Sequence, residues 1–195
     1  MDDIQFTVDL EDYYHAVYPP DEWAKIKPRI EEPVRWLLYH LDKFNIRATF
    51  YVLGHVAWGH PEMVKKIFMQ GHRIGSHGYW HQHNEQFNDA SDRACIEELR
   101  KVLPYMPDRM PYRSPYWDNT PLPGRAGGAF FRLLPYPWTR DEVLKERMFW
   151  IHPHDLDPGH PELEDKFLNI KRHFGLKDSR KRLVRLMEDV NFERR

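Results

Sequence analysis

The sequence predicts an α/β fold in which parallel strands are joined by helices. Three observations lead to this prediction. Strand-like and helix-like apolar segments alternate from residue 4 to residue 103. The strand-like segments are short and are separated by helices rather than tight turns, which favours right-handed crossovers over hairpins. Histidines and acidic residues follow several predicted strands, at residues 9–12, 77–81 and 152–157, where α/β folds collect their active groups.

The first elements follow from apolar spacing. Residues 4–9 (IQFTVD) read as a buried first strand. Residues 48–53 (ATFYVL) are rich in strand-forming types and end at Gly54, as expected of a second strand. A helix is predicted between these strands, because four apolar residues recur there at helical spacing: Val34, Leu37, Leu38 and Leu41.

A second helix presents Val64, Ile67 and Phe68 on one face and closes at Gly71. A short strand at residues 72–76 (HRIGS) comes directly after it. The alternation of strand and helix therefore continues through this part of the chain.

The second half is read with the same rules. A helix is predicted around residues 91–103, and prolines make residues 104–128 irregular. Residues 130–138 (FFRLLPYPW) read as strand-like, residues 139–147 (TRDEVLKER) as a short helix and residues 148–152 (MFWIH) as another strand. The tail from Glu162 reads as one or two helices whose apolar stripe packs on the body: Leu183, Leu186, Met187 and Val190.

Size and charge limit the domain number and the partners. With 195 residues, 41% of them hydrophobic, we expect one domain over residues 1–195, of which residues 162–193 form a helical C-terminal extension. The net charge of −1 provides no overall basic field for nucleic acid or an acidic membrane surface. The composition sets no oligomeric state.

The sequence also bears on the compartment. No stretch approaches the ~18 consecutive apolar residues of a membrane span. The acidic start, MDDIQ, is unlike a secretory signal, so we expect a cytoplasmic protein. A single cysteine, Cys95, excludes an internal disulfide and a CxxC site, and we expect it to fill the core.

The segment GSHGYWHQHN at residues 75–84 places His77 and His81 four positions apart, just after a predicted strand. Small residues around His77 allow a sharp turn, and imidazoles at i and i+4 on one helical turn can share a cation. In a chain with twelve histidines, surface or capping histidines are the alternative interpretation.

The first strand ends in acids that complete such a site. Asp9 and Glu11 are two apart and point to one face while the strand continues, and Asp12 lies just beyond. Buried acids without cations are costly, and a metal would relieve that cost. The alternatives are a solvated acidic loop or a helix N-cap.

Two further clusters are expected at the same end. The segment YRSPYW at residues 112–117 carries Arg113, whose guanidinium can pair with a first-strand carboxylate, and its prolyl loop can fix backbone N–H groups as oxyanion donors. In FWIHPHDLDP at residues 149–158, His152 ends an apolar strand and can serve as general acid. An ordinary turn and a helix-capping aspartate beside incidental histidines are the alternatives.

The order of these segments, from the acidic first strand through RATFYVLG, SHGYWH and RSPYW to WIHPHDLDP, resembles the NodB-type polysaccharide deacetylases, carbohydrate esterase family four. The branch found in bacterial exopolysaccharide and lipopolysaccharide gene clusters is the most similar, and the resemblance covers most of residues 4–193. It implies a distorted (β/α) barrel with fewer than eight strands, on which the C-terminal helices pack.

The resemblance also implies roles for these residues. Asp9 is similar to the family's general base, and His77 and His81 match its two metal histidines. Either Glu11 or Asp12 matches the carboxylate ligand, because this chain has D-x-E-D where adjacent aspartates are usual. The remaining implied roles belong to Arg113, which orients the base, the backbone N–H of Tyr116, an oxyanion donor, and His152, the general acid.

Aromatic residues within the same motifs suit stacking on sugar rings. We expect Tyr14, Trp80 and Trp117 to bind substrate, and core packing is the alternative for each.

One departure from the family's pattern is a shortened region between the third and fifth motifs. From Trp117 to Phe149 there is no room for the family's aspartate-containing fourth motif, and PLPGRAGG at residues 121–128 bridges the gap. The barrel is then incomplete, and Asp118 or Asp155 is the candidate to support the Asp9–Arg113 pair.

These expectations combine into one hypothesis. The chain is a metal-dependent N-deacetylase acting on an N-acetylated sugar of a bacterial surface polysaccharide precursor (O-antigen or exopolysaccharide), carried on a nucleotide or lipid. Two imidazoles and one carboxylate favour zinc, although cobalt, nickel or iron accept the same ligands. The alternatives are a catalytically silent glycan-binding or complex-forming protein on the same fold, and an amidohydrolase of another N-acyl compound.

Overall fold

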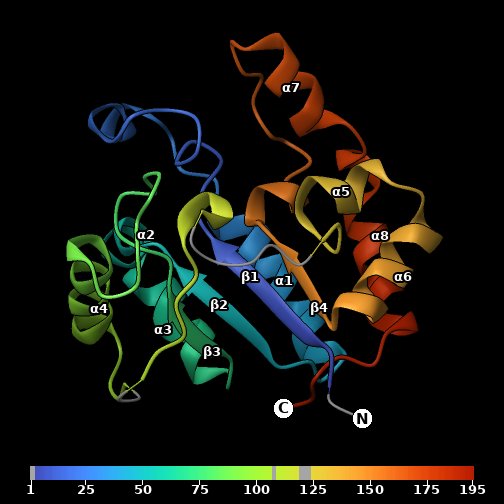
Figure 1. The fold of residues 1–195 in the computed structure, drawn as a ribbon, viewed down its shortest axis with the longest axis horizontal. Coiled ribbons are helices and arrows are strands. Elements are labelled where there is room, and N and C mark those ends of the chain that lie inside the picture. The colour runs from blue at the N-terminus through green and yellow to red at the C-terminus, as the bar shows by residue number, and fades with distance from the viewer. Residues whose placement is uncertain (1–2, 107–108, 119–123) are drawn as a thin grey trace.

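The computed structural model describes residues 3–106, 109–118 and 124–195. Within these ranges the centre of the molecule is a parallel sheet with the strand order β3-β2-β1-β4 (Figure 1). The strands are β1 (Gln5–Leu10), β2 (Ala48–Val52), β3 (Arg73–Ser76) and β4 (Met148–Ile151). The predicted α/β class with parallel strands and helical crossovers is therefore confirmed.

The helices of the described residues alternate with the strands and then gather in the second half of the chain. They are α1 (Glu31–Lys43), α2 (Gly54–Gly59), α3 (Pro61–Met69), α4 (Ala90–Val102), α5 (Gly128–Leu133), α6 (Tyr136–Glu146), α7 (Lys166–His173) and α8 (Leu176–Asp189). Short 3₁₀ helices are η1 (Pro20–Lys25), η2 (Pro115–Trp117) and η3 (Pro153–Leu156).

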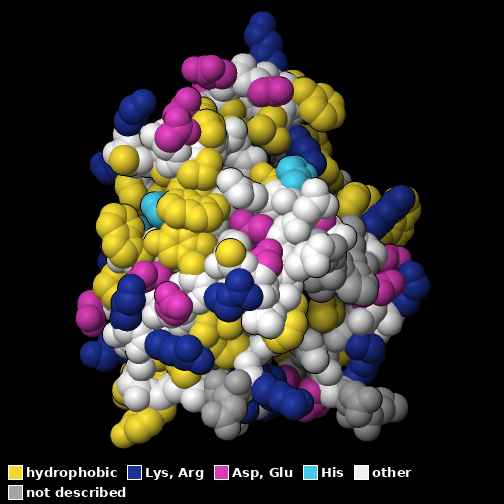
Figure 2. Space-filling view, turned by 60° about the vertical axis from the view of Figure 1, so that its left-hand side comes forward, with side chains coloured by type: hydrophobic (Ala, Val, Ile, Leu, Met, Phe, Trp, Pro, Cys, Tyr) yellow, Lys and Arg dark blue, Asp and Glu magenta, His cyan; other side chains and the backbone are white. Residues whose placement is uncertain are grey.

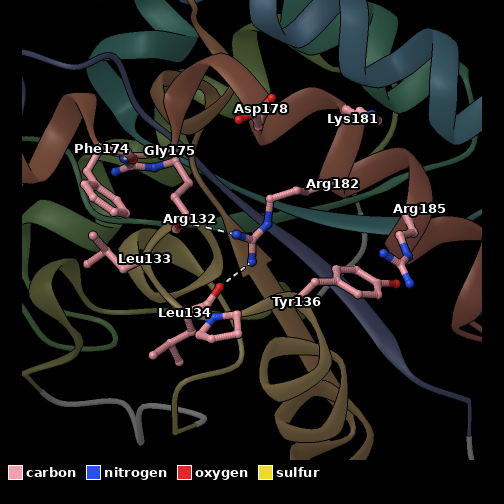
Figure 3. A pocket seen from close by; sticks show the side chains of 11 residues that line it. Arg132, Leu133, Leu134, Tyr136, Phe174, Gly175, Asp178, Lys181, Arg182 and Arg185 are labelled. Atoms are coloured by element: carbon pink, nitrogen blue, oxygen red, sulfur yellow. Dashed lines mark hydrogen bonds between the residues drawn. The ribbon is translucent and has the colours of Figure 1, made fainter.

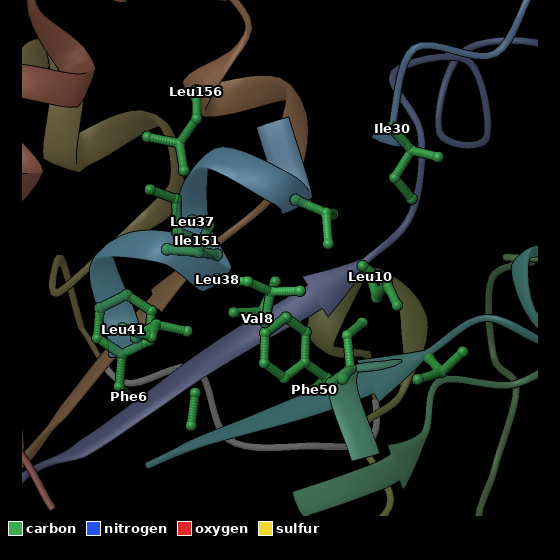
Figure 4. Close-up of a cluster of buried hydrophobic side chains, with 14 of the residues drawn as sticks. Phe6, Val8, Leu10, Ile30, Leu37, Leu38, Leu41, Phe50, Ile151 and Leu156 are labelled. Atoms are coloured by element: carbon green, nitrogen blue, oxygen red, sulfur yellow. The ribbon is translucent and has the colours of Figure 1, made fainter. Parts of the chain in front are cut away.

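One face of the sheet forms the main hydrophobic core (Figure 4). Alternate residues of β1, namely Phe6, Val8 and Leu10, point to this face, because side chains of a strand alternate between its two sides. The buried stripe of α1, which includes Leu37 and Leu41, packs against them. The helical spacing read from the sequence therefore identifies the residues that α1 buries.

The opposite face is more polar and is covered by irregular backbone. Thr7 and Asp9 of β1 point to it, and Arg113 lies across it with its guanidinium 4.0 Å from the centre of the Tyr51 ring. Trp150 of β4 packs there edge-to-face on Trp117. The segment around η2 therefore fills the space that the interior side chains of a closed barrel occupy.

The sheet is open within the described residues, so the barrel expectation is not confirmed. Single parallel bridges extend its two edges, from Ser76 of β3 to Tyr112 and from Trp150 of β4 to Gly127. Arg113 and Trp117 lie over the open side, and the predicted bridging segment PLPGRAGG lies partly outside the described residues, since residues 121–123 belong to the undescribed ranges.

Two differences from the predicted elements concern helices. Residues 130–138 were predicted as strand-like, and this prediction is wrong: they lie in α5, in the turn after it and in the first residues of α6. Pro137 occupies the first turn of α6, where a proline fits because its missing N–H has no intrahelical partner. The short helix α2 was not predicted.

The C-terminal segment closes the N-terminal end of the sheet. Phe192 forms a parallel bridge with Ile4 and packs edge-to-face on Phe6, with ring centres 5.2 Å apart. Leu183, Leu186 and other stripe residues of α8 are buried, as the helical spacing predicts. In the described part of the chain, no helix has the length and apolarity needed to cross a membrane.

Candidate metal centre

Three strands bring the predicted site residues to one end of the sheet. Glu11 follows β1, His77 follows β3 and His152 follows β4. Because the strands are parallel, their C-terminal ends lie at the same edge. A hydrogen bond of 3.0 Å from the His77 N–H to the Val52 carbonyl holds the His77 loop against the end of β2.

Glu11, His77 and His81 converge. One potential ligand atom from each lies within 4.8 Å of the others, and all three side chains are buried. The Oε2 atom of Glu11 is 2.5 Å from Nε2 of His81 but lacks the geometry of a hydrogen bond, and Nδ1 of His81 also has no hydrogen-bond partner. Buried polar atoms that converge without hydrogen bonds fit a set of ligands around one cation.

The surroundings of His77 fix its orientation. Its Nδ1 lies 2.8 Å from the Arg113 carbonyl oxygen, so Nδ1–H donates to that oxygen and Nε2 is left as the ligand atom. Burial lowers the pKa of His77 to about 4, which keeps the imidazole neutral. For Glu11, burial opposes the charge, but the neighbouring His81 holds its pKa well below the usual value. A carboxylate and neutral imidazoles suit a zinc-type cation.

Asp12 does not join this group. Its carboxylate accepts backbone N–H groups of Tyr13 at 2.8 Å, Arg29 at 2.6 Å and Ile30 at 3.0 Å. Of the two carboxylates left open by the sequence, Glu11 faces the histidines and Asp12 instead holds the chain at the start of α1.

Asp9 and Arg113 form a buried ion pair, with Oδ1 of Asp9 2.5 Å from Nη1 of Arg113. The same guanidinium donates to Oγ1 of Thr7 at 3.0 Å and lies 4.2 Å from the centre of the Trp117 ring. These contacts fix the Asp9 carboxylate beside Glu11, in the pairing that the sequence suggested.

The imidazole of His152 also faces the carboxylates of Asp9 and Glu11. Its Nε2 is 3.5 Å from Oε1 of Glu11 and 4.0 Å from Oδ2 of Asp9, and its Nδ1 is 2.9 Å from Oδ2 of Asp155. Burial opposes the charged form of His152, but the hydrogen bond to Asp155 and the nearby acids raise its pKa.

Asp155 is held in turn by Arg132 of α5, whose Nε donates to Oδ1 at 2.8 Å. Both side chains are buried, and Arg132 lowers the pKa of Asp155 well below its usual value against the effect of burial. Arg132 also donates to the carbonyls of Arg172 at 2.8 Å and Phe174 at 2.7 Å, near the end of α7. No sequence pattern pointed to Arg132, because it lies in the segment that was predicted as a strand.

The two aspartates considered as supports for the Asp9–Arg113 pair lie elsewhere. Asp118 accepts from the backbone N–H of Asn84 at 2.9 Å and contacts His83, and Asp155 contacts Arg132 and His152. The expectation that either of them contacts Arg113 is wrong, and Thr7 is the residue that shares its guanidinium with Asp9.

His152, His154 and Asp155 also bring three potential ligand atoms within 4.8 Å of one another. Two cations lie against this second group: Arg132 on Asp155, and Arg172, whose guanidinium contacts Nε2 of His154. Guanidinium groups in these positions disfavour a metal ion, so Glu11, His77 and His81 form the better metal centre.

Aromatic residues surround a groove of about 290 Å³ beside His81, lined by Trp80, Tyr116, His83 and other residues. Figure 2 shows hydrophobic side chains gathered next to acidic ones on this side of the molecule. Trp80 is 42% exposed and Tyr116 is 40% exposed, with the Tyr116 ring centre 4.6 Å from that of His81.

The other predicted sugar-stacking residues are less available. Tyr14 is 3% exposed and packs among His15 and Trp23, so its ring is covered by neighbours here and its sugar-binding role stays a prediction. Trp117 is half-buried between Arg113 and Trp150. Both Tyr116 and Trp117 have left-handed backbone, with φ of 54° and 63°, a strained conformation that is common at functional sites.

Comparison with known proteins gives a consistent result. Residues 29–119 match the family model described as polysaccharide deacetylase, and residues 110–195 match a domain of unknown function, DUF3473. A peptidoglycan-N-acetylglucosamine deacetylase of Bacillus cereus is 34% identical over 84 residues, which are 42% of this chain and 30% of the relative. These matches support the polysaccharide deacetylase family, although the chain spans less than a third of that relative.

Solved structures share the fold. The crystal structure of the peptidoglycan N-acetylglucosamine deacetylase Bc1960 matches with a TM-score of 0.58 at 18% identity, covering 98% of this chain and 86% of that one. A pseudoenzyme of carbohydrate esterase family four from Bacillus anthracis, BA3943, matches with a TM-score of 0.54 at 10% identity, covering 98% and 63%. The α/β fold is therefore that of the polysaccharide deacetylase structures.

Proposed function

From the support for the polysaccharide deacetylase family, we propose that this chain is a metal-dependent N-deacetylase that hydrolyses the acetamide of an N-acetylated sugar. One observation carries the proposal: Glu11, His77 and His81 converge at the strand ends, and Nε2 of His152 lies 3.5 Å from Glu11 and 4.0 Å from Asp9.

The proposed cofactor is a divalent cation held by Glu11, His77 and His81. One carboxylate and two imidazoles favour zinc, and cobalt, nickel and iron accept the same ligands. When bound, such an ion supplies Lewis acidity and makes water ionise near neutral pH. The hydrogen bond from His77 to the Arg113 carbonyl supports this assignment, because it resembles the outer contacts that orient metal-binding histidines.

Asp9 is the proposed general base. Its carboxylate is buried and oriented by Arg113, and it lies close enough to Glu11 to take a proton from a water molecule beside the metal centre. His152 is the proposed general acid, which gives its proton to the departing amine. Its raised pKa keeps the imidazolium populated at higher pH, and Asp155 holds the ring through Nδ1 so that Nε2 faces the site.

The remaining proposed roles concern charge and substrate. The backbone N–H of Tyr116 is the proposed oxyanion donor, since η2 places Tyr116 against His81. Trp80 and Trp117 are the proposed sugar-binding aromatic residues, of which Trp80 has the more exposed ring. The proposed substrate is a bacterial surface polysaccharide precursor (O-antigen or exopolysaccharide) on a nucleotide or lipid carrier in the cytoplasm.

The metal centre is tested by metal analysis of the purified chain. We expect about one divalent ion per chain, and loss of that ion when His77→Ala and His81→Ala are combined. His83→Ala is the matched control, because His83 is an exposed histidine two positions from His81. A wild-type chain that retains no ion after incubation with zinc, cobalt, nickel or iron would contradict the proposal.

The reaction is tested by acetate release from N-acetylglucosamine oligomers and other N-acetylated sugars. We expect Asp9→Asn to keep its metal ion and to lower the turnover by about 10²–10⁴-fold, the range for removal of a general base. A chain that binds metal and sugar but releases acetate from none of these compounds would instead be the silent glycan-binding protein. Release of another acyl group alone would indicate a different N-acyl substrate.

A further inference from the structure

α7 carries an exposed apolar side. Phe167 is 79% exposed, Ile170 is 67% exposed and Phe174, just past the end of the helix, is 55% exposed. The spacing of three and four residues places these side chains on one side of the helix. None of the eight residues of α7 is buried, so this side has no partner among the described residues. Contiguous exposed apolar surface of this kind marks an interaction site.

The apolar side continues into a cavity of about 750 Å³ between the α5–α6 turn and α8 (Figure 3). Phe174 and Leu133 form one wall, and Leu133 is itself 38% exposed. Lys181 and Arg185 of α8 line the opposite part of the cavity, together with the single acid Asp178. The cavity therefore joins an apolar wall to a cationic one.

The charge of this region differs sharply from that of the whole chain. Residues 166–185 contain eight lysines and arginines and one aspartate, with the exposed acids Glu162, Glu164 and Asp165 just before them, whereas the complete chain has a net charge of −1. Four lysines of this segment are exposed and form no ion pair within the described residues: Lys166, Lys171, Lys177 and Lys181. The overall charge thus conceals a local basic surface.

Apolar side chains flanked by exposed cations are the mark of a helix that lies in the interface of an anionic membrane. A free anion in water would be bound by the lysines alone, and the apolar side chains of Phe167 and Ile170 would contribute nothing to its binding. Pairing with a second copy would bring two basic surfaces together, which repulsion opposes. A lipid that carries a phosphate uses both features at once.

We propose that α7 and the cavity beside it bind a membrane surface of phosphate-bearing lipids. Phe167 and Ile170 enter the acyl region, and Lys177 and Lys181 meet the phosphates. In Figure 1, α7 stands at the end of the molecule toward which the strands point, the end that carries His77 and His152. Docking through α7 therefore brings that end close to the lipid surface. This inference stands on the surface alone and is independent of the proposed function.

The test is sedimentation of the full chain with phosphatidylcholine vesicles, with and without phosphatidylglycerol. We expect binding to the vesicles that contain phosphatidylglycerol and much weaker binding to phosphatidylcholine alone. Phe167→Ser with Ile170→Ser should weaken binding about tenfold or more, because two inserted side chains are lost. Lys177→Glu with Lys181→Glu should weaken it by a similar factor.

Matched variants control for changed hydrophobicity and charge. Met69→Ser with Tyr105→Ser removes two equally exposed apolar side chains elsewhere, and Lys65→Glu with Lys66→Glu makes the same charge change on α3. Both control pairs should bind vesicles as the wild type does. Three results would overturn the proposal: no wild-type binding to either vesicle, equal losses in the control pairs, or lipid-free dimerisation that is lost with Phe167→Ser and Ile170→Ser.

Discussion

Arg132 and Asp155 are an ion pair whose two side chains are each about 1% exposed. The pair connects α5 to the imidazole of His152, since Asp155 contacts both. Asp155, which lies three positions after His152, thereby supplies the carboxylate that orients the imidazole of the proposed general acid.

Asp155→Asn is expected to lower the free energy of unfolding by about 3–5 kcal/mol, because Arg132 is left as a buried charge without its carboxylate. It should also lower acetate release by about a hundredfold, because His152 loses the charge that favours its protonated form. Urea denaturation and the acetate assay measure the two effects.

A double variant distinguishes the effect on stability from the effect on acetate release. Adding Arg132→Met to Asp155→Asn removes the unpaired cation, so most of the lost stability should return while acetate release stays low. Recovery of both together would show that Asp155 acts only on stability.

The sequence reveals those site residues that follow strands directly. His77, Glu11 and His152 were found because apolar strand patterns end next to them, and parallel strand ends meet at one edge. Arg132 could not be found in this way. Its partner Asp155 lies 23 positions away, beyond α6 and β4, and nothing in the local pattern links them.

At the scale of elements, periodicity identified strands and helices where one face is buried. α1 is such a case, because its buried residues recur at helical spacing, whereas β1 was identified from a short apolar run and is buried on both faces. The segment at residues 130–138 failed because its aromatic content resembles a strand, whereas tertiary packing of Phe131 and Arg132 holds it as a helix. α2 is only six residues long, too short for a periodic signal.

His72, the residue before β3, connects β3 to β2 through a hydrogen bond whose contribution to stability depends on pH. Its Nδ1 accepts the backbone N–H of Ala48 at 3.2 Å, and burial lowers its pKa to about 4. Above pH ~6.5 the folded and unfolded chains both hold it neutral. As the pH falls from ~6.5 to about 4, only the unfolded chain takes up the proton, so stability is lost in this window.

The expected loss from His72 is about 1.4 kcal/mol per pH unit and about 3 kcal/mol in total. His72→Asn retains an acceptor for the Ala48 N–H and should flatten the dependence of unfolding free energy on pH by that amount. Urea unfolding at pH 7 and pH 5 should capture about 2 kcal/mol of this change, with His83→Asn at an exposed position as control. An identical pH dependence in His72→Asn and wild type would refute this assignment.

At the scale of the molecule, the sequence predicted the α/β class but not the way the sheet ends. Alternating strands and helices determine a parallel sheet, whereas its closure depends on irregular segments such as residues 109–118, which carry no periodic signal. The structure shows Tyr112 and Gly127 bridged to opposite edges, with Arg113 and Trp117 filling the face between. The prolines of this segment follow no regular spacing, so the path of the chain could not be predicted from them.

The C-terminal segment provides the last test of how the whole molecule is held together. Phe192 is fully buried between Phe6 of β1 and Phe149 of β4, and the Glu193 N–H donates to the Ile4 carbonyl at 3.0 Å. Phe192→Ala leaves a cavity at the N-terminal end of the sheet, far from the metal centre.

We expect Phe192→Ala to cost about 3–5 kcal/mol of unfolding free energy, because the lost transfer energy and the cavity add. Phe167→Ala, the same substitution at the exposed side of α7, should change it by no more than about 0.5 kcal/mol. Urea denaturation of both variants at equal metal occupancy makes the comparison. A cost below about 1 kcal/mol for Phe192→Ala would mean that the C-terminal segment packs on the sheet without stabilising it, because a buried Phe→Ala change otherwise costs several times more.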